Sequence, residues 1–358
     1  MLKVLLINQD KIPHYRVPIY NYLTTYLKKE SYALTVVSGG IQEGNRHKIE
    51  FDQIEISLSF PRLANIILKN TPEVIIYWVN LRYFYLFPTL LLIKILRKKA
   101  IYWGHGSDLY KTKAKRLKRF AYNIEFWLSD ALILYGEHLK KNVNSRFYYK
   151  TFIANNTLYF NEYVSKSLDK KKCFSKYNIS TAKNIICIGR MQKRKRLENL
   201  FKAFELMNLR NVGLILVGPD DDGILNEIQG MHVYKLGPIY GDERLDLLSA
   251  AEVFCLPGAV GLSIVDAFYC GLPLVTEDGE VSPEIMYLKD GVNGFIVPRG
   301  DVKQLADKLQ LLLEDDMLRE RFSKEARNEI STNGHIDRMC KGFSDALRFA
   351  CYKRIVQS

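Results

Sequence analysis

The sequence has few of the residues that build metal sites. Its six cysteines and six histidines include no CxxC pair and no Cys/His spacing typical of zinc. The cysteines lie mostly in apolar segments, so we expect reduced core thiols of a cytosolic protein. No DxD pair stands between apolar runs, and "DDDG" at 220–223 is expected to begin a helix. We predict no metal site.

Long apolar runs are also absent. The most membrane-like segment, "YFYLFPTLLLIKILRKK" at 83–99, has about a dozen apolar residues, fewer than the roughly 20 that span a bilayer. The apolar run at the N-terminus is too short for a signal peptide and lacks a small-residue cleavage site. We therefore expect a cytoplasmic chain that does not cross a membrane.

The positive charge is confined to one half of the chain. Residues 1–160 contain 24 Lys and Arg against 11 Asp and Glu, a net charge of +13, whereas residues 161–358 contain 28 of each. Such asymmetry indicates that the first half faces a polyanion, either nucleic acid or an anionic membrane surface. No nucleic-acid motif accompanies the charge, so an anionic membrane is the preferred partner.

Short apolar, β-branched runs alternate with amphipathic stretches in both halves, which predicts βαβ units and parallel sheets. A polar, Lys-rich stretch at 161–183 separates the two series. We predict an α/β fold of two doubly wound, Rossmann-like domains facing across a cleft, at 1–160 and 161–335. A final helix at 336–358 is expected to pack back on the first domain. Ligands of such sheets bind beyond the carboxyl ends of the strands.

Two basic residues follow the first strand of the second half. In "IGRMQKRKRLENLF", Arg190 comes directly after the strand and Lys195 stands at the start of the next helix. Positive side chains near outward-pointing backbone N–H groups suit a diphosphate. The alternative is a solvated basic loop, and the run of neighbouring basic residues leaves the register of the lysine open by one position.

The stretch "GAVGLSIVDAFYCGLPLV" at 258–275 has one acidic residue, Asp266, among small and apolar neighbours. A glycine-containing loop precedes a helix that begins near Leu262, with Ser263 in its first turn. Free N–H groups there suit a phosphate, and Asp266 is placed to accept hydrogen bonds from ribose hydroxyls. The alternative is an acid that only stabilises the helix dipole.

These motifs together resemble a known family. The ordered series "IGRMQKRKRLENLFKAF", "LILVGP", "VYKLGPI", "LLSAAEVFCLPG", "VGLSIVDAFYCGLPLV", "PEIM" and "GVNGFIVP" is similar to the nucleotide-binding domain of retaining GT-B glycosyltransferases of family 4 over about 150 residues. The first half resembles the family more loosely, through "PHYRVPIY", "WGHGSDLY" and "IANNT". The resemblance implies a GT-B fold and transfer of a sugar from a nucleoside diphosphate, with UDP or GDP favoured.

The resemblance also implies roles for single residues. Arg190 and Lys195 would neutralise the donor diphosphate as catalytic groups, and Asp266 would hold the ribose where the family usually has the second glutamate of its E-x7-E motif. Glu284 matches an acidic residue of the family. The segment Gly237, Pro238 and Ile239 would lie against the nucleobase. The remaining donor-site residues are Gly189 and the residues that offer backbone N–H groups to the phosphates, Gly261, Leu262 and Ser263.

One departure from the family is Gly258, which occupies the place of the first motif glutamate that grips the donor sugar. Either other groups hold the sugar, or the sugar has fewer or differently placed hydroxyls, or transfer is impaired. Two alternatives to a transferase therefore stay open: a nucleoside-diphosphate-sugar 2-epimerase of the same fold, and a degenerate relative that only binds a glycan or a partner.

In the first half, His105 follows the strand "AIYWGH" between two glycines. A lone histidine is usually structural, but in similar enzymes a histidine in this region lies near the transferred sugar, so His105 is our third catalytic candidate. Asp10, Arg16 and Asp108 follow strands or lie in the first loop. With His105, they are the candidates for the acceptor side.

The segment "LYKTKAKRLKRFAYNIEFWLSD" joins a cationic stretch to aromatic residues. This pattern suits docking on an anionic membrane, although the aromatic residues could equally belong to the core. We expect a metal-independent, retaining hexosyltransferase on the inner face of the cytoplasmic membrane. It would act on a lipid-linked or oligosaccharide acceptor in polysaccharide synthesis. The membrane-facing candidates are Lys113, Lys115, Arg116, Lys118 and Arg119.

Overall fold

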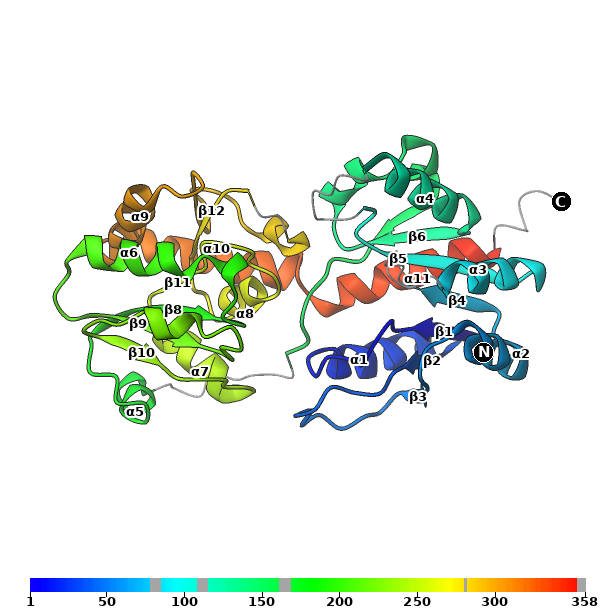
Figure 1. The fold of residues 1–358 in the computed structure, drawn as a ribbon, viewed down its shortest axis with the longest axis horizontal. Coiled ribbons are helices and arrows are strands. Elements are labelled where there is room, and N and C mark those ends of the chain that lie inside the picture. Colours follow the sequence, from blue (N-terminus) through cyan, green and yellow to red (C-terminus); the bar gives the residue numbers. More distant parts are fainter. Residues whose placement is uncertain (78–84, 108–114, 161–168, 280–281, 353–358) are drawn as a thin grey trace. The chain divides into compact units, whose positions relative to one another are not determined.

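A computed structural model describes residues 1–77, 85–107, 115–160, 169–279 and 282–352, except for the side chains of 115–118. The chain divides into two compact units. One comprises Met1–Tyr159 together with the chain from His335 onward, and the other comprises Phe160–Gly334. Each unit contains one parallel sheet with helices around it (Figure 1).

The first unit has a sheet of seven parallel strands in the order β3-β2-β1-β4-β5-β6-β7. The order reverses direction between β1 and β4, which makes the carboxyl ends of these strands a topological switch point. The strands are β1 (Leu2–Ile7), β2 (Tyr32–Ser38), β3 (Asp52–Glu55), β4 (Val74–Tyr77), β5 (Lys99–Gly104), β6 (Ala131–Leu134) and β7 (Thr151–Ile153).

The last described helix, α11 (Ile336–Tyr352), belongs to this first unit, where it packs against β5, β6, β7 and α1. Its Gly342 permits a close approach, because a Cβ there would lie 2.1 Å from the carbonyl oxygen of Ile153. The other helices of the unit are α1 (Arg16–Lys29), α2 (Phe60–Asn70), α3 (Leu86–Ile95), α4 (Lys115–Leu128) and the 3-10 helices η1 (Glu137–Asn142) and η2 (Ser145–Lys150).

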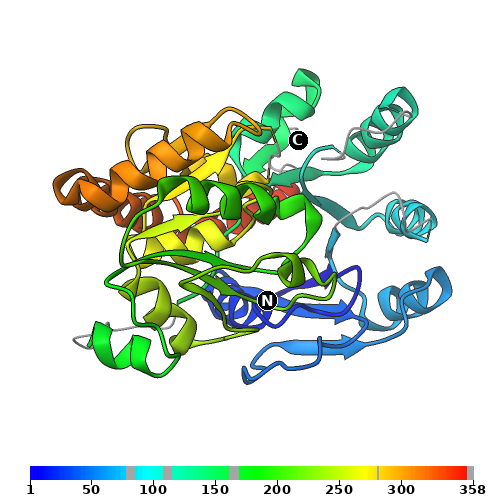
Figure 2. The same cartoon turned by 60° about the vertical axis from the view of Figure 1, so that its left-hand side comes forward.

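The second unit has six parallel strands in the order β10-β9-β8-β11-β12-β13, with a switch point between β8 and β11. Helices cover both faces of this sheet (Figures 1 and 2). Its strands are β8 (Lys183–Ile188), β9 (Val212–Val217), β10 (Val233–Lys235), β11 (Val253–Cys255), β12 (Leu274–Glu277) and β13 (Gly294–Val297). Its helices are α5 (Lys170–Ser175), α6 (Leu197–Met207), α7 (Asp242–Ala250), α8 (Ser263–Tyr269), α9 (Val302–Glu314), α10 (Asp316–Thr332), η3 (Lys193–Lys195), η4 (Ile224–Glu227) and η5 (Pro283–Tyr287).

The central strands are apolar along their whole length because both of their faces are covered. All residues of β4, β6 and β9 are buried. The edge strands β3 and β13 were not predicted from the sequence. In β3, "DQIE" is polar and none of its residues is buried, as is common at sheet edges. No helix in the described part of the chain has the length and apolar content needed to cross a bilayer.

Candidate functional site

The loops after β8 and β11 meet at the switch point of the second unit. Gly258 N–H donates to the carbonyl oxygen of Lys195 over 2.9 Å, and Ala259 N–H donates to that of Arg194 over 3.1 Å. The basic loop and the glycine loop that the sequence singled out are therefore hydrogen-bonded to each other. They form one surface at the carboxyl edge of the sheet, where a ligand of this fold binds.

The two predicted diphosphate-binding side chains differ in their surroundings. Arg190 is exposed and has no hydrogen bond or ion pair to any residue that the structure describes. Lys195 is buried, and its Nζ donates to the carbonyl oxygens of Ala259 and Val260. The ammonium thus brings positive charge directly before the loop that leads into α8, while Arg190 is accessible to an anion.

Glycine lets three loops approach one another beside Arg190. Gly189 and Gly218 both have positive φ angles, +147° and +146°, and a Cβ on Gly218 would lie 1.8 Å from the carbonyl oxygen of Gly189. A Cβ on Gly189 would lie 3.5 Å from the hydroxyl of Ser263. The predicted residues Gly189 and Ser263 are therefore neighbours at this edge.

The start of α8 offers fewer free N–H groups than the sequence predicted. Gly261 N–H donates to Ser282 Oγ over 3.0 Å. The helix begins at Ser263, preceded by Leu262 at its N-cap. The "DDDG" turn behaves as predicted, since both carboxylate oxygens of Asp220 accept backbone N–H bonds, from Ile224 and Leu225, at the start of η4.

Asp266 forms an ion pair that the sequence did not predict. Arg244, on α7, donates from Nη2 to Asp266 Oδ1 over 2.8 Å. Burial raises the pKa of the Asp266 carboxyl, and the charge of Arg244 partly offsets that effect. Asp266 faces the neighbouring helix as a paired carboxylate. No motif marks Arg244, because only the folding of α7 against α8 brings it there.

A glutamate does not fit at position 258 in this loop conformation. A Cβ on Gly258 would lie 2.0 Å from the carbonyl oxygen of Arg194 and 2.7 Å from Lys195 Cα. The loop after β11 is packed directly onto the backbone of the basic loop. In this conformation, the space that a side chain at position 258 would need is filled by backbone.

A second ion pair at this edge joins Arg196 to Glu277. The two side chains are 9% and 0% exposed and lie 2.8 Å apart, and Glu277 also accepts from Asn199 Nδ2 and Gly300 N–H. Arg196 further donates to the carbonyl oxygen of Pro257. Within the basic run, the Arg196 guanidinium is thus bound to groups of the second unit itself.

The predicted nucleobase segment follows β10. Gly237 accepts a 2.7 Å hydrogen bond from Gly218 N–H, which ties this segment to the loop after β9. Pro238 is exposed and Ile239 is partly exposed, so both present apolar surface at the edge. Glu284, in η5, is buried.

Two acceptor-side candidates, Arg16 and His105, lie at the carboxyl edge of the first unit's sheet. Arg16 begins α1 and is buried, with its guanidinium 4.7 Å from the centre of the Trp103 ring. His105 follows β5, and its ring lies 4.7 Å from that of Tyr135. Burial, together with the charges of Arg16 and His138, lowers the pKa of His105 to about 4. The imidazole is therefore neutral at pH 7.

Of the other two acceptor-side candidates, the structure describes only Asp10. Asp10 is exposed, and its carboxylate accepts from the backbone N–H of Lys11. Asp108 lies outside the described residues, as does the membrane-facing candidate Lys113. The side chains of Lys115, Arg116 and Lys118 are likewise outside the description, and Arg119 is exposed on α4.

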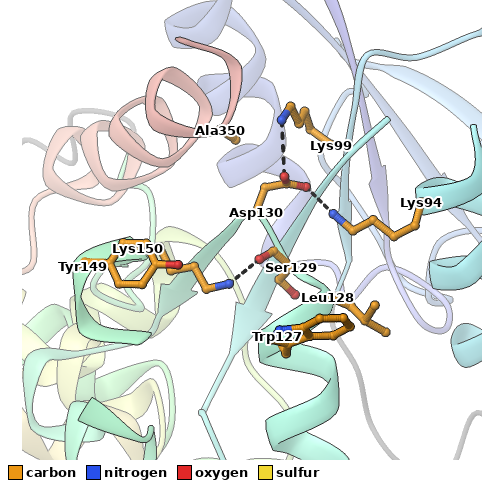
Figure 3. A pocket seen from close by; sticks show the side chains of 9 residues that line it. All are labelled: Lys94, Lys99, Trp127, Leu128, Ser129, Asp130, Tyr149, Lys150 and Ala350. Carbon is orange, nitrogen blue, oxygen red and sulfur yellow. Dashed lines mark hydrogen bonds and ion pairs between the residues drawn. The ribbon is translucent and has the colours of Figure 1, made fainter. Parts of the chain in front are cut away.

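A cavity of about 430 Å³ lies at the opposite, amino edge of the first unit's sheet. Figure 3 shows Lys94 and Lys99 converging on Asp130, at 2.5 and 3.4 Å. Lys150 donates to the carbonyl oxygen of Ser129 over 2.6 Å. Three lysines against one aspartate make this hollow cationic. Its rim carries the exposed rings of Trp127 and Tyr149.

Comparison with known proteins identifies the second unit. Residues 169–329 match the sequence profile of the family described as glycosyl transferases group 1. The second unit carries a group 1 glycosyltransferase domain. The match coincides with the sheet, the basic loop and the Arg244–Asp266 pair, which lie within it.

Curated relatives match this group 1 domain over part of their length. A phosphatidyl-myo-inositol mannosyltransferase of Mycobacterium leprae is 31% identical over 150 residues, 39% of this chain and 40% of that protein. A capsular polysaccharide biosynthesis glycosyltransferase of Staphylococcus aureus, CapM, is 25% identical over 193 residues, 50% of this chain and 49% of that protein. The chain thus spans under half the length of either relative.

The fold matches over the whole chain. The crystal structure of Anabaena HepE in complex with UDP-glucose aligns with a TM-score of 0.76 and 16% identity, covering 97% of this chain and 99% of HepE. The predicted fold class is confirmed: both units are parallel-sheet α/β domains of the GT-B fold.

Proposed function

We propose that this protein is a glycosyltransferase that moves a sugar from a nucleoside diphosphate to a glycan acceptor. The observation that carries the proposal is the hydrogen-bonded pair of loops at the β8–β11 switch point of the group 1 domain. There an exposed Arg190 and the charge of Lys195 flank the loop into α8. HepE, which shares the fold, was crystallised with UDP-glucose, and this supports a nucleotide-sugar donor.

The proposed chemistry needs a group that stabilises the leaving nucleoside diphosphate. Arg190 supplies a guanidinium that can bind two phosphate oxygens at once. Lys195 adds a fixed positive charge through its contacts at 259–260, without reorganisation during the reaction. We infer a metal-independent reaction, in which these cations take the place of a metal ion, and retention at the anomeric carbon as in the family that the sequence resembles.

The acceptor is proposed to be lipid-linked or an oligosaccharide of surface polysaccharide synthesis, reached from the inner face of the cytoplasmic membrane. Two curated relatives support this direction, since one is named for phosphatidyl-myo-inositol and the other for capsular polysaccharide. In the first unit, α4 exposes Phe120, Ile124 and Trp127, spaced four and three residues apart and so on one face. The cationic hollow adjoins Trp127 (Figure 3).

Vesicle sedimentation tests the membrane part. The purified protein should pellet with vesicles containing anionic phosphatidylglycerol and not with phosphatidylcholine alone. Neutralising Lys113 to Arg119 should weaken pelleting more than tenfold, since each surface cation contributes about 1 kcal/mol. Trp127→Ala should also weaken pelleting, because it removes exposed apolar area that would be buried in the membrane interface. Met231→Ala, at an exposed apolar residue of the second unit, is the matched control. Unchanged binding of both variants would remove the membrane proposal.

The transferase activity is tested with labelled UDP- and GDP-sugars and a bacterial lipid extract as acceptor. Transfer of label to the lipid phase, retained in EDTA and lost in Arg190→Ala, is the expected result. Conversion of the nucleotide sugar to its 2-epimer without acceptor would instead identify an epimerase. Nucleotide binding without either reaction would identify a degenerate relative.

A further inference from the structure

The first residue of α1, Arg16, is a buried cation without a carboxylate partner among the residues that the structure describes. Arg16 is 7% exposed, and its Nη2 donates to two neutral atoms, Tyr135 Oη at 3.3 Å and Asn156 Oδ1 at 3.5 Å. Its Nη1 has no hydrogen-bond partner in the part of the chain that the structure describes. Buried arginines are normally paired with an acid, because an unpaired buried charge is destabilising.

A second unsatisfied donor comes from the loop between β1 and α1. Gln9, 6% exposed, has a buried side-chain nitrogen, Nε2, that likewise has no partner among the described residues. Its neighbour Asn8 is held in place, accepting from Tyr20 Oη over 2.9 Å and donating to the carbonyl oxygen of Asp10 over 2.8 Å. The loop is thus ordered by its neighbours and carries a buried donor that no described acceptor satisfies.

The guanidinium is held in a preorganised position. It lies over the Trp103 ring at 4.7 Å, and the Tyr135 ring centre is 5.8 Å away. Stacking on aromatic rings fixes the plane of an arginine while leaving its outer N–H groups for a ligand. A site of this kind suits an anionic group with several oxygens, such as a phosphoryl or carboxylate group.

We propose that Arg16, with Gln9, binds an anionic oxygen group of the acceptor substrate at the carboxyl edge of the first unit's sheet. This inference rests on the proposed transferase function and deepens it. The acceptor is an anionic molecule, and Arg16 binds its negatively charged group. Arg16 is a binding residue and takes no part in bond making. His105, which the charge of Arg16 influences, lies beside the site and reports on its occupancy.

The experiment follows the titration of the His105 ring by NMR in the full-length protein, with its signal assigned by His105→Asn. Sulfate serves as the probe because it stays doubly charged throughout the titration, and chloride at equal ionic strength is the reference. Sulfate on Arg16 should move the His105 midpoint upward from about 4 toward the ordinary value of about 6.5. Arg16→Met should show a raised midpoint in chloride and no further response to sulfate.

Two further variants keep the test decisive. Arg62→Met removes an exposed arginine of the same unit and should respond to sulfate like the wild type. Arg16→Lys keeps the charge but not the planar guanidinium, so it should bind sulfate at least several-fold more weakly than the wild type. If Arg16→Met does not fold, Arg16→Lys takes its place in the comparison. A midpoint that sulfate does not move in the wild type, or moves equally in Arg16→Met, would overturn the proposal.

The source of the anion is separated by adding UDP first. If the site belongs to the acceptor, UDP leaves the His105 midpoint unchanged and sulfate still raises it, also in Arg190→Met. If UDP alone raises the His105 midpoint and sulfate then causes no further rise, Arg16 binds the donor diphosphate and the acceptor assignment is wrong. A sulfate response in a protein that binds no nucleotide would retain the anion site and overturn the proposed function instead.

Discussion

Arg244 and Asp266 form a 2.8 Å ion pair that links α7 to α8 at the carboxyl edge of the second sheet. The aspartate, chosen from the sequence for its isolation among apolar residues, therefore has a structural partner besides its proposed ligand. A carboxylate can accept further hydrogen bonds through its second oxygen. We therefore propose a positioning role for Arg244, whose charge favours the ionised form of Asp266 and whose hydrogen bond would orient that carboxylate toward a ribose.

The pair predicts how nucleotide affinity depends on pH. Since burial raises the pKa of Asp266, its ionised form is lost at a higher pH than that of an ordinary aspartate. Affinity should be constant above that pKa and fall as the pH drops through it. Arg244→Gln removes the offsetting charge, so the fall should begin at higher pH, and Asp266→Asn should weaken binding about tenfold or more at pH 7. Calorimetric titration from pH 5 to 8 measures this, with the exposed Asp242→Asn as control. Parallel profiles for wild type and Arg244→Gln would contradict the positioning role.

A side chain at position 258 should destabilise the second unit. Gly258→Ala places its methyl group 2.0 Å from a carbonyl oxygen, and overpacking of this kind costs about 1–3 kcal/mol. We expect the melting temperature to fall by several degrees and Gly258→Glu to abolish nucleotide binding, although it restores the family residue. Gly291→Ala, with positive φ but open space, is the control for backbone strain. A stable Gly258→Glu variant with tighter nucleotide-sugar binding would refute this explanation of the departure.

Breaking the buried Arg196–Glu277 pair should be far more costly than breaking a surface pair. Glu277→Gln leaves a buried guanidinium without a counter-charge, which typically costs about 3–5 kcal/mol. Asp307→Asn breaks the exposed pair with Lys303 on α9 and should cost under about 0.5 kcal/mol. Urea unfolding of both variants measures the difference, and equal midpoints would show that Glu277 is dispensable.

Glu125 should make the first unit less stable as the pH rises. The residue is fully buried on α4, both carboxylate oxygens lack partners among the described residues, and burial raises its pKa well above the ordinary 4.5. The native state keeps the proton that the unfolded state loses above about pH 4.5, so stability declines from there up to the raised pKa. Glu125→Gln removes this decline, and its melting temperature should exceed that of the wild type more at pH 8 than at pH 5. Glu198→Gln, at an exposed residue of α6, should not change the difference between the two pH values.

The sequence was sufficient for the features that depend on local pattern. Continuous apolar runs such as those of β4, β6 and β9 predict buried parallel strands, because no other common element combines that length with β-branched residues. The strand-to-helix loops at Arg190 and Gly258–Gly261 were recognisable for the same reason. Since all strands are parallel, both loops had to lie at one edge of the sheet.

Pairings between distant segments could not be read from the sequence. Arg244 meets Asp266 and Arg196 meets Glu277 only through the packing of separate elements, and no spacing rule connects them. The polar edge strand β3 lacks the alternation that marks a half-buried strand. From the sequence, Gly258 has the pattern of a lost functional residue, but in the folded chain the backbone of the basic loop fills the space beside it.

We propose that the β8–β11 edge of the second unit binds a nucleoside diphosphate. The most direct measurement is a thermal-shift panel of UDP, GDP, ADP and CMP on the wild type, Arg190→Ala, Asp266→Ala and the exposed control Arg210→Ala. A ligand at about a hundred times its Kd adds about 2.7 kcal/mol of stability, which raises the melting temperature by several degrees. We predict such a shift with UDP or GDP in the wild type and Arg210→Ala, abolished in the other two variants. No shift with any nucleotide, or an equal shift in all four proteins, would show that this edge is not a nucleotide site.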